Sequence, residues 1–367
     1  MKFSIQQSDI LEGLKIVSRA VSTSNTLPVL GNVLIRAAGR KVHFSATNLE
    51  LSIMTSVEAN VQNEGALTVP AKILTSYVSL LPKEAELELA VTDGSTLQVK
   101  SNTSKTKIKG IAAEEFPEIK SVDVGIKMSI DTDKFRDGIH KVAFAAQENS
   151  SRPILSGVFL ATNKKELRMA ATDTYRLSEK VIELEQEVEP ASCVIPVRAV
   201  LEADRLSGKE ESVSLTIAEN QIMITVGVTS LMSRLIDGQF PDYKRIIPAK
   251  AQTTAKIDRN ALEMAVRRVS IFAKQNNQHM KLQLLSDGQL EIFTDSTEIG
   301  EEKTTIPVSI TGATNQIALN SDYVLDVLSA LSSEAEIQLE LDSKMTPAVI
   351  KTTKESGFVH LIMPLKM

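Results

Sequence analysis

The chain has 367 residues, an ordinary apolar content of 43% and a formal net charge of −5. It contains no apolar run near the roughly 18 to 20 residues of a membrane span, and its first residues lack the apolar core of a secretory signal. Cys193 is the only cysteine, which excludes an intrachain disulfide, and four scattered histidines leave little material for a zinc site. We therefore expect a cytoplasmic protein without metal or cofactor.

The first part of the chain has a mixed helix and strand pattern. An alternating strand comes first, and an amphipathic helix with a polar cap follows it. Further strands, a second helix and a closing pair of strands complete the unit. In chain order we predict a strand over 2–5, a helix beginning near Ser8-Asp9, strands over 33–35, 41–46 and 49–56, a helix over 73–81, and strands over 86–91 and 96–100.

The same order recurs in two further units. In the second we predict a strand over 128–130, a helix from Thr132-Asp133, a helix over 197–206, and strands over 212–217 and 221–226. In the third we predict a strand over 254–257, a helix from Asp258, a helix over 321–331, and strands over 336–341 and 348–351. Polar stretches separate the units, so we predict three domains at residues 1–122, 123–250 and 251–367.

Independent sequence anchors repeat at one period. The threonines Thr47, Thr172 and Thr294 recur at intervals of about 124 residues, and so do Pro117, Pro241 and Pro364. This period is too long for a solenoid repeat but suits a self-sufficient globular domain. The three units are therefore copies of one ancestral domain.

The opening helices carry a repeated charge pattern. Ile10, Phe135 and Leu262 begin the apolar face that we predict to be buried. Basic residues fall on or beside the opposite face: Lys15, Arg19, Lys141, Arg267 and Arg268. A solvated face is the ordinary interpretation of one such helix, but its recurrence in all three units favours a nucleic-acid surface despite the negative net charge.

Four segments carry a family resemblance: 26–32 (TLPVLGN), 171–177 (ATDTYRL), 237–243 (DGQFPDY) and 362–367 (IMPLKM). Over its whole length the chain resembles the bacterial DNA polymerase III beta subunit, the replication sliding clamp. The resemblance implies an α+β fold of three tandem clamp domains that forms a head-to-tail homodimeric ring, with helices lining the inside and antiparallel sheets outside. It implies a non-catalytic processivity factor that encircles double-stranded DNA without sequence specificity and tethers the replicative polymerase. The clamp loader and other proteins with clamp-binding peptides are further implied partners.

The resemblance also implies a pocket for partner peptides between domains 2 and 3. Its apolar members suit such a cleft, and methionine adapts to several partners. The alternative for any one of these residues is core packing, above all for Leu177. The matching positions are Leu155, Thr172, Thr174, Tyr175, Arg176, Leu177, Pro241, Arg245, Ile246, Asn320, Tyr323, Leu361, Ile362, Met363, Pro364, Leu365 and Lys366.

Domain size argues separately for a dimer. A domain of about 120 residues is roughly 35 Å across, so a ring of four leaves a hole of about 14 Å and a ring of six leaves roughly 35 Å. A duplex is at least about 16 Å thick, so six domains, or two chains, are needed to encircle it. Complementary ends predict the interface, with a lysine-protected edge strand as the alternative. Its predicted residues are Lys105, Lys107, Ile108, Ile271, Phe272, Glu298, Glu301 and Glu302.

The chain departs from the family pattern at several loop positions. Ser24 lies in a loop where members often carry an arginine, Pro153 and Ile154 replace tyrosines, and Tyr175 replaces a common histidine. Arg152 remains as a DNA-facing candidate.

Two other classes compete with the clamp: an enzyme that uses Asp173, Tyr175 and Arg176, and a repeat adhesin or ligand-binding scaffold.

Overall fold

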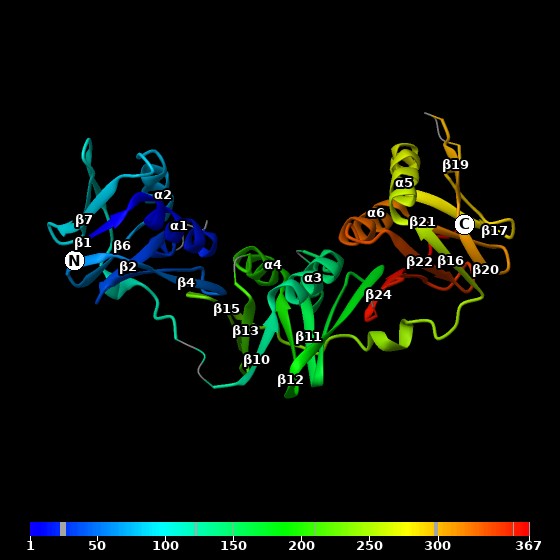
Figure 1. Cartoon of the computed structure of the whole chain (residues 1–367), viewed down its shortest axis with the longest axis horizontal. Helices are drawn as coiled ribbons and strands as arrows, with labels where there is room; N and C mark the ends of the chain where they lie inside the picture. Colours follow the sequence, from blue (N-terminus) through cyan, green and yellow to red (C-terminus); the bar gives the residue numbers. More distant parts are fainter. Residues whose placement is uncertain are drawn as a thin grey trace. The chain divides into compact units, whose positions relative to one another are not determined.

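The computed structural model describes residues 1–22, 27–120, 122, 124–148, 150–208, 210–296, 300–354 and 356–366. Ser24, Thr26, Glu298 and Met367, together with Asp123, where we predict that the second domain begins, lie outside the described residues. The chain divides into two compact units, one of Met1–Thr132 with Leu201–Leu235 and one of Asp133–Val200 with Ile236–Met367. Each unit combines helices with antiparallel sheets (Figure 1). The middle repeat thus contributes to both.

The first unit contains two antiparallel sheets. The five-stranded sheet has the order β5 (Asn60–Asn63), β1 (Lys2–Gln6), β7 (Glu86–Thr92), β8 (Thr96–Lys100) and β9 (Lys105–Lys109). The eight-stranded sheet has the order β10 (Ile126–Asp131), β13 (Ser212–Ile217), β14 (Gln221–Val226), β15 (Thr229–Arg234), β4 (Leu51–Glu58), β3 (Lys41–Thr47), β2 (Asn32–Ala38) and β6 (Gly65–Pro70). Strands of the first and second repeats therefore share one sheet, joined where β15 pairs with β4.

The helices of the first unit are α1 (Gln7–Val17) and α2 (Ala71–Ser79), with 3-10 turns η1 (Ser18–Ala20), η2 (Pro28–Gly31) and η3 (Ala113–Glu115). The helix α4 (Val197–Leu206) crosses the boundary between the units. Ile10 is fully buried, which confirms the predicted inner face of α1. The predicted cap at Ser8-Asp9 is wrong, because α1 already begins at Gln7, whose side-chain amide donates to the Val78 carbonyl at 2.7 Å.

The second unit also contains two antiparallel sheets. The seven-stranded sheet has the order β11 (Gly157–Thr172), β12 (Arg176–Pro196), β24 (Phe358–Ile362), β23 (Ala348–Thr352), β22 (Glu336–Leu341), β16 (Thr253–Asp258) and β20 (Ser309–Gly312). The four-stranded sheet has the order β19 (Lys303–Pro307), β18 (Gln289–Phe293), β17 (His279–Leu285) and β21 (Asn315–Asn320). Here β24 of the third repeat pairs with β12 of the second.

The helices of the second unit are α3 (Thr132–Val142), α5 (Arg259–Ala273) and α6 (Ser321–Ala330), with 3-10 turns η4 (Ala143–Ala145), η5 (Pro153–Ser156), η6 (Tyr243–Ile246) and η7 (Lys274–Asn276). Asp258 caps α5 by accepting a hydrogen bond from the Ala261 backbone N–H, and the Asn320 side chain caps α6 in the same way. Both side chains satisfy amide groups that a helix leaves without internal partners, as the sequence predicts.

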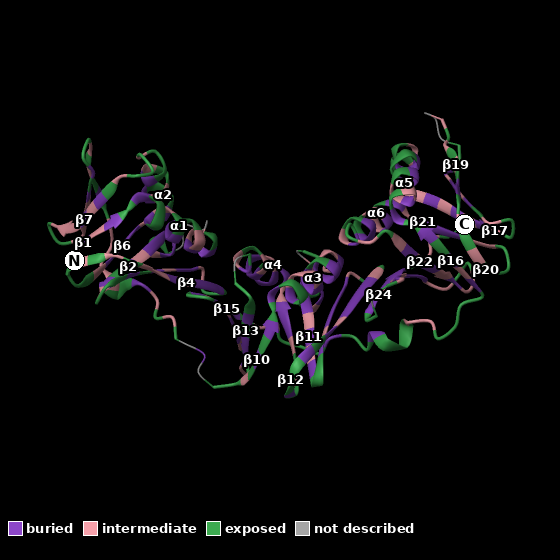
Figure 2. Ribbon diagram, viewed as in Figure 1, coloured by how far each residue is buried: buried purple, intermediate pink, exposed green. Residues whose placement is uncertain are grey.

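Each unit places its core between the helices and the inner faces of its sheets. Burial alternates along the strands, visible as purple and green segments in Figure 2; in β3, for example, Val42 and Phe44 are fully buried while Lys41 and His43 are exposed. Gly13 lets α1 approach β3 closely, because a Cβ there would lie 2.8 Å from the Phe44 ring.

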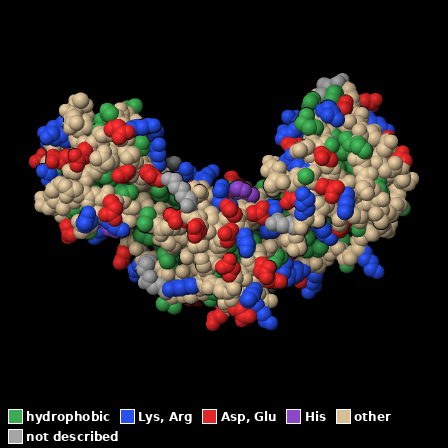
Figure 3. Space-filling model, in the orientation of Figure 1, with side chains coloured by type: hydrophobic (Ala, Val, Ile, Leu, Met, Phe, Trp, Pro, Cys, Tyr) green, Lys and Arg blue, Asp and Glu red, His purple; other side chains and the backbone are tan. Residues whose placement is uncertain are grey.

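The surface carries both signs of charge. On the face shown in Figure 3, Lys and Arg side chains are interspersed with Asp and Glu, so neither sign forms one continuous field. Within the described residues, no helix is long and apolar enough to cross a membrane. The same residues contain no group of three or more His, Cys, Asp or Glu side chains placed to hold a metal ion.

Candidate docking pocket and nucleic-acid interface

The turn between β11 and β12 is built by polar side chains that satisfy its own backbone. Thr172 Oγ1 donates to the Arg176 carbonyl at 2.6 Å and accepts from the Thr174 N–H at 3.1 Å. Asp173 Oδ1 accepts from the backbone N–H groups of Tyr175 and Arg176 at 2.9 and 2.8 Å. Thr174 adopts a φ of 78°, the left-handed region that glycine normally occupies. The turn is thereby fixed with the Tyr175 side chain 62% exposed at its tip.

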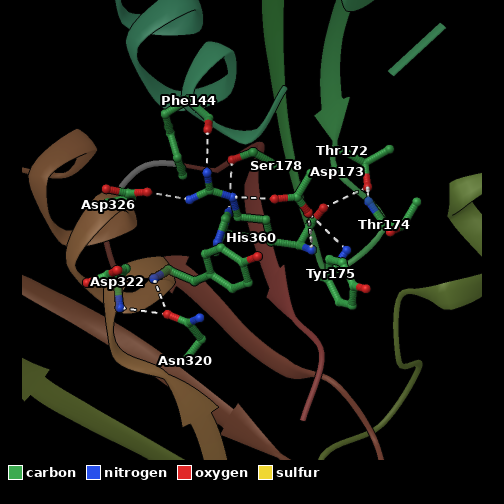
Figure 4. Close-up of polar contacts among 12 residues, drawn as sticks. Phe144, Thr172, Asp173, Thr174, Tyr175, Ser178, Asn320, Asp322, Asp326 and His360 are labelled. Atoms are coloured by element: carbon green, nitrogen blue, oxygen red, sulfur yellow. Dashed lines mark hydrogen bonds and ion pairs between the residues drawn. The ribbon is translucent and has the colours of Figure 1, made fainter. Parts of the chain in front are cut away.

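Arg176 anchors this turn to its surroundings, through partners that Figure 4 labels as Asp173, Asp326 and Phe144. Its guanidinium bonds the Asp173 carboxylate at 3.0 Å, the Asp326 carboxylate at 2.5 Å and the Phe144 carbonyl at 2.8 Å. The guanidinium carbon also lies 4.6 Å from the centre of the Tyr323 ring, a cation–π distance. The side chain is only 11% exposed, so Arg176 joins β12, η4 and α6 from a nearly buried position.

A buried histidine lies beside this network. His360 is fully buried on β24, and its Nδ1 lies 3.1 Å from Ser178 Oγ. Because the Ser178 hydroxyl donates its proton to the Lys141 carbonyl at 2.6 Å, His360 must donate to Ser178 from Nδ1. Its Nε2 has no hydrogen-bond partner among the described residues. Burial, with a smaller effect of Arg176, lowers the pKa of His360 to about 3.

The C-terminal segment lies against the same turn. The backbone N–H of Met363 donates to the Tyr175 carbonyl at 2.8 Å, which extends the pairing of β24 with β12. Farther along, the Leu365 N–H donates to the Ala318 carbonyl at 2.8 Å. Tyr175 and Met363, 62% and 38% exposed, therefore form one apolar surface held by backbone bonds.

The structure divides the predicted pocket residues into two groups. Leu177 and Leu361 pack with Phe240 and Tyr243 in a buried cluster, so these two leucines belong to the core rather than to an open surface. Leu155, Thr172 and Ile362 are also buried, whereas Asn320 caps α6 and Tyr323 stacks on Arg176. The accessible members are the exposed residues Thr174, Tyr175, Pro241, Arg245, Ile246, Met363 and Lys366, with Pro364 and Leu365 half-buried.

A separate cavity of about 430 Å³ lies beside η6. Its wall includes Arg168, Phe240 and Tyr243, and Tyr243 Oη donates to the Glu179 carboxylate. Burial, and the bond to Glu179, raise the pKa of Tyr243. Only Pro241 of the predicted pocket residues lines this cavity, so it is distinct from the predicted docking pocket.

The basic residues of α1 are accessible, as predicted. Lys15 is exposed and makes no ion pair within the part of the chain that the structure describes. Arg19, in η1, is exposed and lies 3.4 Å from the Glu202 carboxylate.

The basic residues of α5 are exposed but bound to acidic neighbours. Arg267 contacts Glu263 at 2.5 Å, and the arginine lowers the pKa of that carboxyl group. Arg268 donates to Thr304 at 2.9 Å and lies 3.9 Å from Glu302. Their charges are therefore partly compensated.

Lys141 does not reach the surface, which overturns its predicted orientation. Its side chain is 2% exposed and lies 2.8 Å from Asp137 and 3.8 Å from Glu334. Glu334 follows α6 and is remote in sequence, so a helical wheel of α3 gives no sign that this face is covered. By contrast Arg152, which precedes η5, is exposed.

Comparison with known proteins decides the family. Models of the DNA polymerase III beta subunit match in tandem: the N-terminal domain at residues 1–120, the central domain at 129–242 and the C-terminal domain at 244–366. The chain belongs to the DNA polymerase III beta subunit family.

Full-length relatives agree with this assignment. The chain is 32% identical to a Beta sliding clamp of Synechocystis sp., with all of both chains covered. The sliding clamp of Bacillus subtilis superposes with a TM-score of 0.96 at 27% identity, covering 100% of this chain and 99% of that one. The sliding clamp of Pseudomonas aeruginosa bound to griselimycin superposes with a TM-score of 0.95 at 28% identity, with both chains fully covered. The predicted α+β clamp fold and the non-catalytic processivity role are those of this family.

The sequence prediction missed one basic residue, Arg205 of α4. Arg205 of α4 lines a groove of about 290 Å³ together with Lys15 and Arg19. The predicted charge pattern covers only the opening helix of each unit, so α4 lies outside it. A helical wheel of α4 would have placed Arg205 among the candidates, although Glu202 lies 2.5 Å from it.

The predicted interface residues that the structure describes lie on or beside two edge strands and on helix α5. Lys105 and Lys107 are exposed on β9, the edge strand of the five-stranded sheet, whereas Ile108 on the same strand is 7% exposed and packs inward. In the second unit β19 is the edge of the four-stranded sheet, and Glu301 and Glu302 precede it. Ile271 on α5 is 60% exposed, and Phe272 is half-buried.

Proposed function

We propose that two copies of this chain join head to tail into a ring around duplex DNA and tether the replicative polymerase to it. The observation that carries this proposal is the tandem match of all three beta subunit domains across residues 1–366. We also propose three domains, at residues 1–122, 123–250 and 251–367. Three domains alone do not provide a wide enough hole, so the proposal requires a second copy.

Ring closure suits the edge strands β9 and β19. Edge strands present unpaired backbone N–H and C=O groups, which form hydrogen bonds with another chain when they are not protected. The β9 edge carries Lys105 and Lys107, and the β19 edge is preceded by the acidic Glu301. Opposite charges on the two edges favour β9 of one copy beside β19 of the next, while exposed Ile271 supplies apolar area.

A closed ring stays on DNA because the two are topologically linked. Strong phosphate binding is then unnecessary, and weak contacts without sequence specificity permit sliding. Exposed Lys15, with Arg19 and Arg205 beside the same groove, supports a modest basic surface of this kind, and so do the partly compensated arginines of α5.

Partner docking is supported by the surface of Tyr175 and Met363. Exposed apolar side chains held on a fixed backbone offer an anchor site for a short peptide, with exposed Arg245 available for a polar or acidic group. Peptides of the polymerase, the clamp loader and repair proteins are the proposed ligands. Tethering raises the effective concentration of a polymerase near the primer end, so that release is followed by recapture.

Retention on circular DNA tests the ring. After loading by a clamp loader, the protein should stay on a nicked circular plasmid during gel filtration and leave once one restriction cut makes the plasmid linear. A binder held by charge alone would respond to salt and not to the cut. Equal retention on both forms, or a strictly monomeric mass in solution, would contradict the proposal.

A further inference from the structure

The turn that presents Tyr175 has a structural copy in the first unit. Between β3 and β4, Thr47 Oγ1 donates to the Leu51 carbonyl at 3.2 Å and accepts from the Leu49 N–H at 3.0 Å. Asn48 Oδ1 accepts from the N–H groups of Glu50 and Leu51 at 3.0 and 2.8 Å. Leu49 has a φ of 75°, against 78° for Thr174. Each bond and the left-handed residue repeat those of the β11–β12 turn.

The strand beside this turn is repeated as well. The Arg234 N–H donates to the Glu50 carbonyl at 2.9 Å, as the Met363 N–H donates to the Tyr175 carbonyl. The register of β15 on β4 also matches that of β24 on β12, because Met232 pairs with Ser52 at the position where Leu361 pairs with Leu177. Glu50 and Arg234 thus occupy the places of Tyr175 and Met363.

A cavity of about 190 Å³ opens beside the copied turn. Leu49, Ile119 and Met232 supply its apolar wall, and residues 117–120 line it from a separate segment of the chain. Pockets for small molecules usually measure about 300 to 1,000 Å³. The cavity is therefore too small for a cofactor-sized ligand but matches one aliphatic side chain.

The charged residues around this cavity are available to a ligand. Glu50 and Arg234 come from the turn and β15, and Glu118 and Lys120 come from the separate segment 117–120. All four are exposed, and none has an ion pair or a side-chain hydrogen bond with the residues that the structure describes. The turn with β15 and the segment 117–120 thus each supply one carboxylate and one cation, a charge balance that fits neighbouring charges of both signs rather than a polyanion.

We propose that this cavity is a second peptide-docking site, which accepts an extended segment of a partner protein through one aliphatic side chain flanked by a basic and an acidic residue. The proposal rests on the proposed function in one respect, because the copied turn is interpreted through the docking role of Tyr175. The cavity, its free charges and its apolar wall do not depend on that role.

Methionine methyl groups provide a direct test in the full chain. With ¹³C-labelled methionine methyls, Met232 reports on the new cavity and Met363 on the Tyr175 surface. The probe is the blocked peptide Gly-Lys-Leu-Glu-Gly, and the control is Gly-Lys-Gly-Glu-Gly. We expect a saturable shift of the Met232 signal with the leucine peptide, with a Kd on the order of 1 mM, and no saturable shift with the control. No saturable Met232 shift, or equal shifts with both peptides, would overturn the proposal.

Matched glycine variants locate the effect. Leu49→Gly removes an apolar wall at a position whose φ suits glycine, so the fold should persist. We expect its Kd for the leucine peptide to rise about tenfold, the loss of one partly buried aliphatic contact. Thr174→Gly at the other turn should leave the Met232 titration unchanged. An unchanged Kd in Leu49→Gly, or a Met232 shift with a duplex oligonucleotide and not with peptide, would also overturn the proposal.

This experiment can contradict the proposal for one docking surface without contradicting the proposal for the other. A peptide from the replicative polymerase that leaves the Met363 signal unmoved would count against the proposed function while the Met232 titration still decides the second cavity.

Discussion

Arg176 donates from Nη1 to the Asp326 carboxylate at 2.5 Å, and this contact joins the start of β12 to α6. The two residues are 150 positions apart in the sequence. The same guanidinium also donates to the carboxylate of Asp173, which lies in the turn that carries Tyr175. The position of the exposed tyrosine is therefore coupled to the packing of α6.

Removing Arg176 should destabilise this region strongly. Arg176→Leu leaves the Asp173 carboxylate, itself 11% exposed, without its charged partner and also removes the bond to the Phe144 carbonyl. We expect the free energy of unfolding to fall by about 3 kcal/mol. Asp326→Asn should cost about 1 kcal/mol, because Asp326 is 48% exposed and solvent screens its charge. Urea denaturation of both variants measures the difference.

Arg245→Ala is the matched control for that comparison. Arg245 also forms an ion pair, with Asp242 at 2.6 Å, but its side chain is 85% exposed. Its loss should change the unfolding free energy by less than about 0.5 kcal/mol. An effect as large as that of Arg176→Leu would contradict the interpretation that burial makes the Arg176 contacts strong.

His360 should make stability depend on mildly acidic pH. Its folded pKa is about 3, below the ordinary value of 6.5, because burial disfavours the imidazolium. Above pH 6.5 both states are neutral and the group contributes nothing to the pH dependence. Between the two pKa values only the unfolded state binds the proton, so stability falls as pH decreases, by about 1.4 kcal/mol per pH unit from this group.

The variant His360→Phe separates this effect from the carboxylates that titrate in the same range. The wild-type slope of unfolding free energy between pH 6 and 4 should exceed that of the variant by about one proton. Parallel curves for the two proteins would show that His360 takes up its proton in the folded state as well.

Thr174 tests the backbone strain in the turn. A threonine at a φ of 78° is disfavoured, whereas glycine adopts this conformation freely. Thr174→Gly should therefore leave stability unchanged or raise it by up to about 1 kcal/mol, despite the larger entropy of the unfolded chain. Thr174→Val keeps the branched shape at the same φ and should show no gain. The thermal midpoints of the two variants, compared at one pH, give the answer.

Local patterns in the sequence predict much of the fold but not all of the surface. The buried faces of α1, α3 and α5 follow from the helical period, and the Asp258 and Asn320 caps follow from residue type. The burial of Lys141 could not be predicted in this way, because its partner Glu334 is remote in sequence. A helical wheel describes one helix and contains no information on what covers it.

The candidate docking site shows the same limit. The sequence marks Leu177 as the pocket candidate that best suits core packing, but it does not show how far Tyr175, two positions earlier in the same motif, is exposed. The two residues differ in burial because of the turn geometry, which the side-chain hydrogen bonds of Thr172 and Asp173 fix. The recurrence of Thr47 and Thr172 predicts that the two turns correspond, but the hydrogen bonds that they share come only from the structure.

The basic groove beside α1 predicts a specific salt dependence. In the assembled ring, replacing Lys15 and Arg205 by Ala should weaken DNA binding in dilute salt. It should also reduce the slope of log K against log salt by up to about 0.9 for each DNA phosphate that the variant no longer neutralises. Lys141→Met is the contrasting variant: it should lower stability, since it leaves the Asp137 carboxylate without this partner, but it should leave the slope unchanged. Fluorescence anisotropy of a labelled duplex over a salt series measures both slopes.

Deleting residues 363–367 should separate docking from ring formation. The deletion removes the Met363 side chain and its backbone bond to Tyr175, together with the Leu365 bond to Ala318, but leaves β24 and its pairing with β12 intact. Polymerase stimulation on a primed circle should therefore be lost while the dimer mass persists. Met363→Ala with the tail intact distinguishes the side chain from the backbone: because the bond to Tyr175 survives, a loss of stimulation in this variant as well would assign docking to the apolar methionine. Normal stimulation by the deletion variant would place the docking surface elsewhere on the molecule.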